Sequence, residues 1–271
     1  MSWLTKTTLA TAVGLLVTTG SGLAQQKPFQ PEPYQPGKDV VWVPSSPAMV
    51  AKMLDLAKVT PQDFVIDLGS GDGRNVIAAA KRGARALGVE YNPDMVELSR
   101  RLAREAGVAE KATFVQGDMY EADISQATVL ALFLLPTNLD KLKDKFTALK
   151  PGTRIVVNTF GVTGWTPDIN DRIENCTEWC TVMLYVVPAS VAGRWLIGEG
   201  TLTLTQEFQN VSGTLADGAP GVPIANGVLR ADQLTFSVGD AKYSATVSGD
   251  SMTGQMVLAG TSTPFVARRI K

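Results

Sequence analysis

The chain has 271 residues, of which 45% are hydrophobic and 19% charged, so it can bury one large core or a large and a small one, and wholesale disorder is excluded. Its 25 basic and 26 acidic residues give a formal net charge of -1, and the basic residues are scattered along the sequence. A nucleic-acid partner is therefore disfavoured, because phosphate binding needs a concentrated basic surface.

The N-terminus has the pattern of an export signal. Lys6 supplies a positive charge, residues 9–17 are apolar, and small residues at 22–24 precede Gln25. We expect a signal peptide over residues 1–24 and an exported, periplasmic protein, with a membrane contact only if this segment stays uncleaved. Its apolar run is about half the ~20 residues that a membrane-spanning helix needs. Residues 25–39 are rich in Pro and Gln and predict an extended leader.

Residues 40–182 alternate between helix and strand patterns. Ser46 and Pro47 have the residue types of a helix start, and apolar residues then recur at helical spacing. Five short apolar runs predict strands, at residues 64–67, 86–90, 113–116, 129–134 and 154–158. Helical patterns separate most of them, so we expect an α/β fold with a doubly wound, Rossmann-like parallel sheet. Ligands of such sheets bind at the carboxyl ends of the strands.

The character of the chain changes at residue 183. Short runs without helical spacing, at residues 201–205, 233–238, 243–247 and 252–256, are separated by Gly, Asp, Asn and Pro. They predict a small antiparallel β domain over residues 183–271, either an appended sheet or a small barrel. It carries no constellation of chemically active residues.

The cysteine and histidine counts limit the metal and redox chemistry. Cys176 and Cys180 are the only cysteines, and their spacing permits a short-loop disulfide in an oxidising compartment, although they can equally remain free. Two cysteines without any histidine cannot complete a zinc site, so we expect no metal.

A glycine-rich turn follows the first predicted strand, within Asp67 to Gly73. Such a turn lets the backbone approach a ligand closely and directs helix N–H groups at it. The spacing is G-x-G-x-G, whereas the dinucleotide fingerprint requires G-x-G-x-x-G, which disfavours an NAD-dependent oxidoreductase. Glu90 ends the second predicted strand, where an acidic side chain can reach a ribose in this architecture.

Several motifs together resemble those of the class I (seven-strand) S-adenosylmethionine-dependent methyltransferases. Within that class the chain resembles exported bacterial methyltransferases related to the FAM173-type lysine methyltransferases, over about residues 40–160. The resemblance rests on Val43-Pro44 with Pro47, Asp67 to Arg74, Gly88 to Asn92, Gly117-Asp118 and Leu134 to Pro136. It implies S-adenosyl-L-methionine as cofactor and N-methylation of a protein lysine, with a small molecule as the alternative acceptor.

The resemblance also implies roles for single residues in binding the cofactor. Glu90 would accept from both ribose hydroxyls, Asp118 would accept from the adenine amino group, and Met119 would pack beside the adenine ring. The methionine part would be held by Asp67, Gly69, Ser70, Gly71 and Gly73.

Residues after the fifth predicted strand are candidates for the acceptor site. Asn158, Phe160 and Trp165 either line an acceptor pocket there or are ordinary loop and core residues. No catalytic residue can be assigned, and the absence of histidine excludes a histidine base. Alignment and desolvation of the acceptor can suffice for methyl transfer, and Asp118, Tyr120 and Asp123 are the candidates if a base exists. The competing hypothesis is a non-catalytic exported protein that keeps the fold as a ligand- or partner-binding module.

Overall fold

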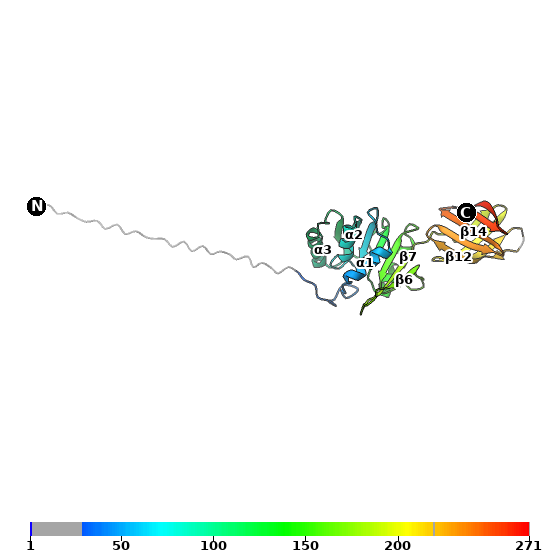
Figure 1. Cartoon of the computed structure of the whole chain (residues 1–271). Helices are drawn as coiled ribbons and strands as arrows, with labels where there is room; N and C mark the ends of the chain where they lie inside the picture. Colours follow the sequence, from blue (N-terminus) through cyan, green and yellow to red (C-terminus); the bar gives the residue numbers. More distant parts are fainter. Residues whose placement is uncertain (2–28, 219, 271) are drawn as a thin grey trace.

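The computed structural model describes Met1, residues 29–218 and residues 220–270. The expected signal peptide, apart from Met1, lies outside the described residues. The described chain contains a mixed α/β part followed by an all-β part (Figure 1). No helix in the described part of the chain is both long and apolar enough to cross a membrane.

Seven strands form the first sheet, in the order β3-β2-β1-β4-β5-β7-β6. Strands β1 to β5 are parallel to one another, which confirms the predicted parallel sheet, and β7 runs antiparallel between β5 and β6. The strands are β1 (Phe64–Leu68), β2 (Arg85–Glu90), β3 (Ala112–Gln116), β4 (Val129–Leu132), β5 (Arg154–Asn158), β6 (Ile169–Arg172) and β7 (Thr181–Val186). The parallel strands therefore present their carboxyl ends at one edge, as the sequence predicted.

Helices cover both faces of this sheet, as expected for a doubly wound fold. Apolar residues of α1 (Pro47–Leu56), α2 (Arg74–Lys81) and α3 (Pro93–Glu105) share one core with one face of the strands, and α4 (Pro136–Thr147) packs in the core on the other face. The capping residues set the helix starts. Ser46 Oγ accepts from the Met49 amide at 3.1 Å, and Asn92 Oδ1 accepts from the Asp94 amide at 2.9 Å.

The C-terminal sheet is antiparallel and closes on itself, because β10 pairs with both β9 and β12. Inward side chains such as Trp195, Leu234 and Met252 fill its interior. This confirms the predicted β-rich C-terminal fold in its barrel form. Its strands are β8 (Gly193–Ile197), β9 (Gly200–Glu207), β10 (Asn210–Ala216), β11 (Val222–Pro223), β12 (Ala225–Arg230), β13 (Gln233–Val238), β14 (Ala241–Ser248), β15 (Ser251–Leu258) and β16 (Thr261–Arg269).

An aromatic contact joins the two sheets. The Trp165 ring stacks on Phe208, with centroids 4.8 Å apart, and packs at 5.2 Å against Tyr185 of β7. The Gln209 side-chain amide donates to the Thr166 carbonyl at 2.7 Å. The expected boundary between residues 182 and 183 falls inside β7, so the first sheet extends to Val186. Thr181–Val186 is apolar and buried, so composition alone did not separate it from the strands that follow.

The described part of the expected leader is folded back on itself. The Tyr34 amide donates to the Trp42 carbonyl at 2.8 Å, and the Trp42 amide donates to the Gln35 carbonyl at 3.0 Å. Pro36 and Val41 form a β-bridge inside this turn. The prediction of an extended segment was therefore wrong from Tyr34 onward, because local backbone hydrogen bonds close the turn.

Candidate functional site

A cavity lies at the carboxyl ends of β1 to β4. Most of the residues that the sequence singled out for the cofactor line it, namely Asp67, Gly69, Ser70, Gly71, Glu90, Asp118 and Met119. Residues to which the sequence analysis gave no role in the site complete the wall, namely the turn from Gln35 to Ser45 together with Asp72, Arg74, Asn75, Val89, Tyr91, Asn92, Met95, Gly117, Phe133 and Leu134. The turn was missed because its Pro-rich composition has no apolar period, and only Val43-Pro44 marked it.

The glycines of the turn after β1 have left-handed backbone conformations, with φ of 71° at Gly69, 54° at Gly71 and 79° at Gly73. At Gly71 a Cβ atom would lie 2.5 Å from Nε1 of Trp42, so the Trp42 ring covers the bare backbone of the turn. Gly73 does not line the cavity; a Cβ there would lie 2.5 Å from the Phe114 ring. Its position is explained by backbone conformation and by packing of α2 on β3.

Glu90 organises the turn. Its Oε2 accepts from the Gly71 amide and its Oε1 accepts from the Asn92 amide, each at 2.9 Å. A carboxylate has about four acceptor positions, so two remain for other donors. The pair of oxygens therefore suits a ligand with two neighbouring hydroxyl groups.

Asp67 is a buried carboxyl at the bottom of the cavity, with 3% of its surface exposed. Burial raises its pKa well above the usual value, the charges of Glu90 and Asp72 add to the rise, and a hydrogen bond from Asn75 at 3.1 Å opposes it. Ser70 Oγ and Asn75 Oδ1 are also buried and have no hydrogen-bond partner among the described residues. A ligand with a positive charge and hydrogen-bond donors fits this end of the cavity, since it would stabilise the carboxylate and the free oxygens.

Asp118 stands at the other end of the cavity, after β3. It accepts from the Lys38 ammonium, and this bond is the main reason why its pKa lies below the usual value. Its second oxygen accepts from the Tyr120 amide at 2.9 Å. Lys38 also lies over the Tyr91 ring, 4.9 Å from its centroid. The ion pair attaches the N-terminal turn to this end of the cavity.

The three acceptor-site candidates have different positions. Asn158 is buried and donates to Ser45 Oγ at 3.0 Å, so it supports the cavity wall. Phe160 lies beside the cavity and packs on Phe133, which lines it, with centroids 6.2 Å apart. Trp165 is 3% exposed and belongs to the junction of the two sheets, so the core interpretation holds for this residue.

Of the three candidate bases, only Asp118 lines the cavity. The Tyr120 hydroxyl accepts from the Asn138 side-chain amide at 2.7 Å, away from the lining. Asp123 is solvent-accessible, and hydrogen bonds from Ser125 lower its pKa. Asp118 also has a lowered pKa, which makes it a weak base. The arrangement therefore gives no support to a dedicated base.

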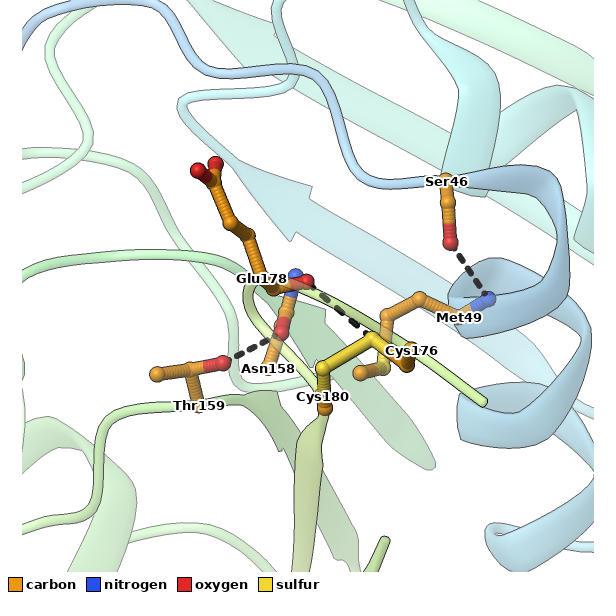
Figure 2. Close-up of a disulfide and its surroundings, with 7 residues drawn as sticks. All are labelled: Ser46, Met49, Asn158, Thr159, Cys176, Glu178 and Cys180. Carbon is orange, nitrogen blue, oxygen red and sulfur yellow. Dashed lines mark hydrogen bonds between the residues drawn. A yellow bond between two sulfur atoms is a disulfide. The ribbon is translucent and has the colours of Figure 1, made fainter. Parts of the chain in front are cut away.

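Cys176 and Cys180 form a disulfide, the alternative that the sequence left open. The bridge closes the loop between β6 and β7, and Figure 2 shows it together with Asn158 and Thr159, at the end of β5, and with the first turn of α1. The Thr159 amide donates to the Thr181 carbonyl at 2.7 Å, which holds the disulfide loop at the same edge of the sheet as the cavity.

Comparisons with known proteins agree with this geometry. The ANTKMT methyltransferase domain family matches residues 67–169. A protein-lysine N-methyltransferase of Saccharolobus islandicus is 41% identical over 151 residues, which is 55% of this chain and 94% of that protein. The adenine nucleotide translocase lysine N-methyltransferase of Mus musculus is 36% identical over 160 residues, which is 58% of this chain and 69% of the mouse protein.

A solved structure is also similar, an RNA methyltransferase from Salinibacter ruber in complex with S-adenosyl-L-homocysteine. It is 44% identical, with a TM-score of 0.52 over 55% of this chain and 96% of that one.

Fold, site and comparisons define the class: this is a class I, S-adenosylmethionine-dependent methyltransferase. The chain belongs to the family of the Saccharolobus protein-lysine N-methyltransferase, which it matches over nearly the whole of that protein. The matches to that protein and to the Salinibacter enzyme each cover 55% of the chain, which leaves the other 45% outside them.

Proposed function

We propose that this protein is exported and transfers a methyl group from S-adenosyl-L-methionine to the side-chain amine of a lysine in another protein. The observation that carries the proposal is the cavity in which Asp67, the glycine turn and Glu90 meet at the carboxyl ends of β1 and β2. The names of the relatives support lysine as the acceptor.

The residues around the cavity fit the parts of the cofactor. The free acceptor positions of Glu90 suit the two ribose hydroxyls, the buried Asp67 suits the positively charged methionine end, and Asp118 with Met119 suits the adenine ring. When bound, the cofactor supplies a methyl group on a sulfonium. The Trp42 ring lies against the backbone of Gly71 and shields this part of the glycine turn.

The charges near the site favour an amine over RNA as acceptor. The cations that line the cavity are already engaged, Lys38 with Asp118 and Arg74 with Asp72. The disulfide loop adds the exposed acidic residues Glu174 and Glu178. RNA binding needs basic groups that neutralise phosphates, whereas a lysine is attracted by acidic ones.

Transfer to a lysine forms a bond between nitrogen and the methyl carbon and breaks the bond between sulfur and that carbon. The amine must be neutral when it attacks, so it releases a proton beforehand. A dry, apolar channel lowers the pKa of an amine without the help of a particular side chain. This accords with a site where Tyr120 and Asp123 lie away from the cavity and where Asp118 is paired with Lys38.

Export rests on the N-terminal pattern of Lys6, residues 9–17 and the small residues before Gln25. The disulfide supports it, since such bonds persist in oxidising compartments. An enzyme in the periplasm would depend on cofactor that has crossed the membrane. Cell fractionation tests this part: recovery of the processed chain with the periplasmic fraction is expected, and recovery of an unprocessed chain in the cytoplasm would refute it.

Calorimetric titration with S-adenosylmethionine, S-adenosylhomocysteine and NAD tests the cofactor. We expect binding of the first two and none of NAD. The acceptor is tested with radiolabelled cofactor offered to periplasmic protein and to total RNA from the same cells. Label on lysine in protein is the expected result. Label on RNA alone would refute the acceptor, and binding without transfer to either would favour a non-catalytic binding module.

A further inference from the structure

The edge of the sheet that holds the cavity continues over β5 and β7 and carries three aromatic side chains. Phe133 follows β4, Phe160 follows β5 and Trp179 precedes β7, so neighbouring strands deliver them to one place. Their ring centroids lie 6.2 Å apart for the two phenylalanines, 5.8 Å for Phe133 and Trp179, and 5.6 Å for Phe160 and Trp179. Phe133 also lines the cavity, so the aromatic cluster begins where the cavity ends.

Trp179 is held in an unfavourable backbone conformation. Its φ is 56°, in the left-handed region, which costs a residue with a side chain about 1–2 kcal/mol. The disulfide closes the loop around it, and Cys180 is buried. Thr159, the residue before Phe160, has φ of 62°. Strain of this kind persists where the surroundings determine the conformation, and it concentrates at binding sites.

The aromatic cluster is neither fully buried nor fully exposed. All three side chains are partly exposed, and the rings touch one another, so together they form an aromatic wall. The Nε1 donor of Trp179 is buried and has no hydrogen-bond partner among the described residues. A buried donor without an acceptor is unfavourable by about 1–3 kcal/mol, which adds to the unfavourable free energy of the Trp179 conformation.

We propose that Phe133, Phe160 and Trp179 form the wall against which the alkyl chain and amine of the methyl acceptor lie, and that the Cys176–Cys180 disulfide positions Trp179 for this contact. This inference rests on the proposed function and assigns the ligand class, a primary alkylamine. Aromatic faces attract alkylammonium groups and shield methylene groups from water. The exposed Glu174 and Glu178 of the same loop favour the approach of a cation.

The five tryptophans of the chain allow the two sites to be tested separately. In protein labelled with 5-fluorotryptophan, fluorine NMR resolves each indole, and Trp42→Phe and Trp179→Phe variants assign the two signals of interest. Trp42 lines the cofactor cavity, Trp179 stands in the aromatic wall, and Trp195 is fully buried in the closed sheet. The Trp42 signal reports on the binding of S-adenosylhomocysteine. The Trp179 signal reports on the binding of n-butylammonium, which mimics a lysine side chain.

We expect S-adenosylhomocysteine to shift the Trp42 signal, and n-butylammonium, added to the saturated protein, to shift the Trp179 signal while Trp195 stays unmoved. Pentanoate has the same four-carbon alkyl chain with the opposite charge and serves as the control ligand. If S-adenosylhomocysteine shifts the Trp42 signal but n-butylammonium leaves the Trp179 signal unchanged, the inference is overturned and the proposed function is not. Absence of any Trp42 response to S-adenosylhomocysteine would instead overturn the proposed function, and the inference with it.

Replacement of both cysteines by serine tests the positioning role. We expect the Trp179 response to n-butylammonium to weaken about tenfold in apparent affinity, while the Trp42 response to S-adenosylhomocysteine stays as in the parent protein. Thr177→Ala, a change of an exposed residue in the same loop, serves as the matched control. An unchanged Trp179 response in the cysteine-free protein would contradict the role of the disulfide.

Discussion

Replacement of Glu90 by glutamine tests the central contact of the cofactor site. In the structure each carboxylate oxygen accepts one backbone amide, from Gly71 and from Asn92. In the variant the NH2 group must replace one of these oxygens and would then face an N–H donor. The change also removes one of the acceptors proposed for the ribose hydroxyls.

A hydrogen bond to a charged group contributes about 1.5–3 kcal/mol. Loss of one ribose contact, together with a loosened turn, should therefore weaken cofactor binding by about 3 kcal/mol, which corresponds to roughly a 100-fold increase in Kd. Calorimetric titration with S-adenosylhomocysteine measures this directly. Glu97→Gln, which removes a carboxylate 67% exposed on α3, is the matched control and should leave Kd unchanged.

Thermal melting, followed by circular dichroism, distinguishes a local loss of binding from unfolding. A Glu90→Gln protein that melts like the parent and binds S-adenosylhomocysteine within about threefold of the parent would refute the assigned role of Glu90.

Three further predictions concern buried or strained positions. Burial raises the pKa of Asp67 in the folded state, so the folded protein loses stability as pH rises from the ordinary pKa of an aspartate through the raised pKa of Asp67. The Asp67→Asn variant should therefore melt at a higher temperature than the parent at pH 8, melt like the parent at low pH, and bind the cofactor more weakly. An equal difference in melting temperature at both pH values would contradict this. Gly71→Ala should abolish calorimetric cofactor binding because the new Cβ meets Trp42, whereas Gly107→Ala, also at positive φ but in open space, should alter stability alone; equal loss of binding in both variants would argue against the contact. Trp165→Ala should lower the free energy of unfolding in urea by about 3–5 kcal/mol, and a loss below about 1 kcal/mol would show that the aromatic junction contributes little.

The sequence pointed to residues that share one cavity because its signals there are local. The first strand, the glycine turn and the following helix are consecutive, and Glu90 ends the next strand, so residue type and spacing placed Asp67, Gly71 and Glu90 in one cavity. The parallel order of β1 to β5 follows from the same alternation. The cofactor itself came from resemblance to a known family.

The parts that were missed depend on contacts distant in the chain. Lys38 meets Asp118 across 80 positions, and no periodic pattern marks such a pair. Trp165 was read as an acceptor-site candidate because it follows the fifth strand, but Phe208 covers it from the other sheet. Phe133 was passed over because it falls inside the apolar run predicted as the fourth strand, although it lines the cavity.

The closure of the C-terminal sheet restricts how this part of the chain can recognise another molecule. In an open sheet the edge strands offer free amides and carbonyls to which a peptide can add as an extra strand. Here the ladder runs in the order β8-β9-β10-β12-β13-β14-β15-β16 and back to β8, and the two-residue strand β11 pairs with β10 alone. Among the described residues, the main-chain groups of the strands in the closed ladder are therefore largely engaged with each other. A partner protein that binds this closed sheet must therefore be recognised by side chains. Sequence changes on the outer surface of the sheet would then alter the choice of partner.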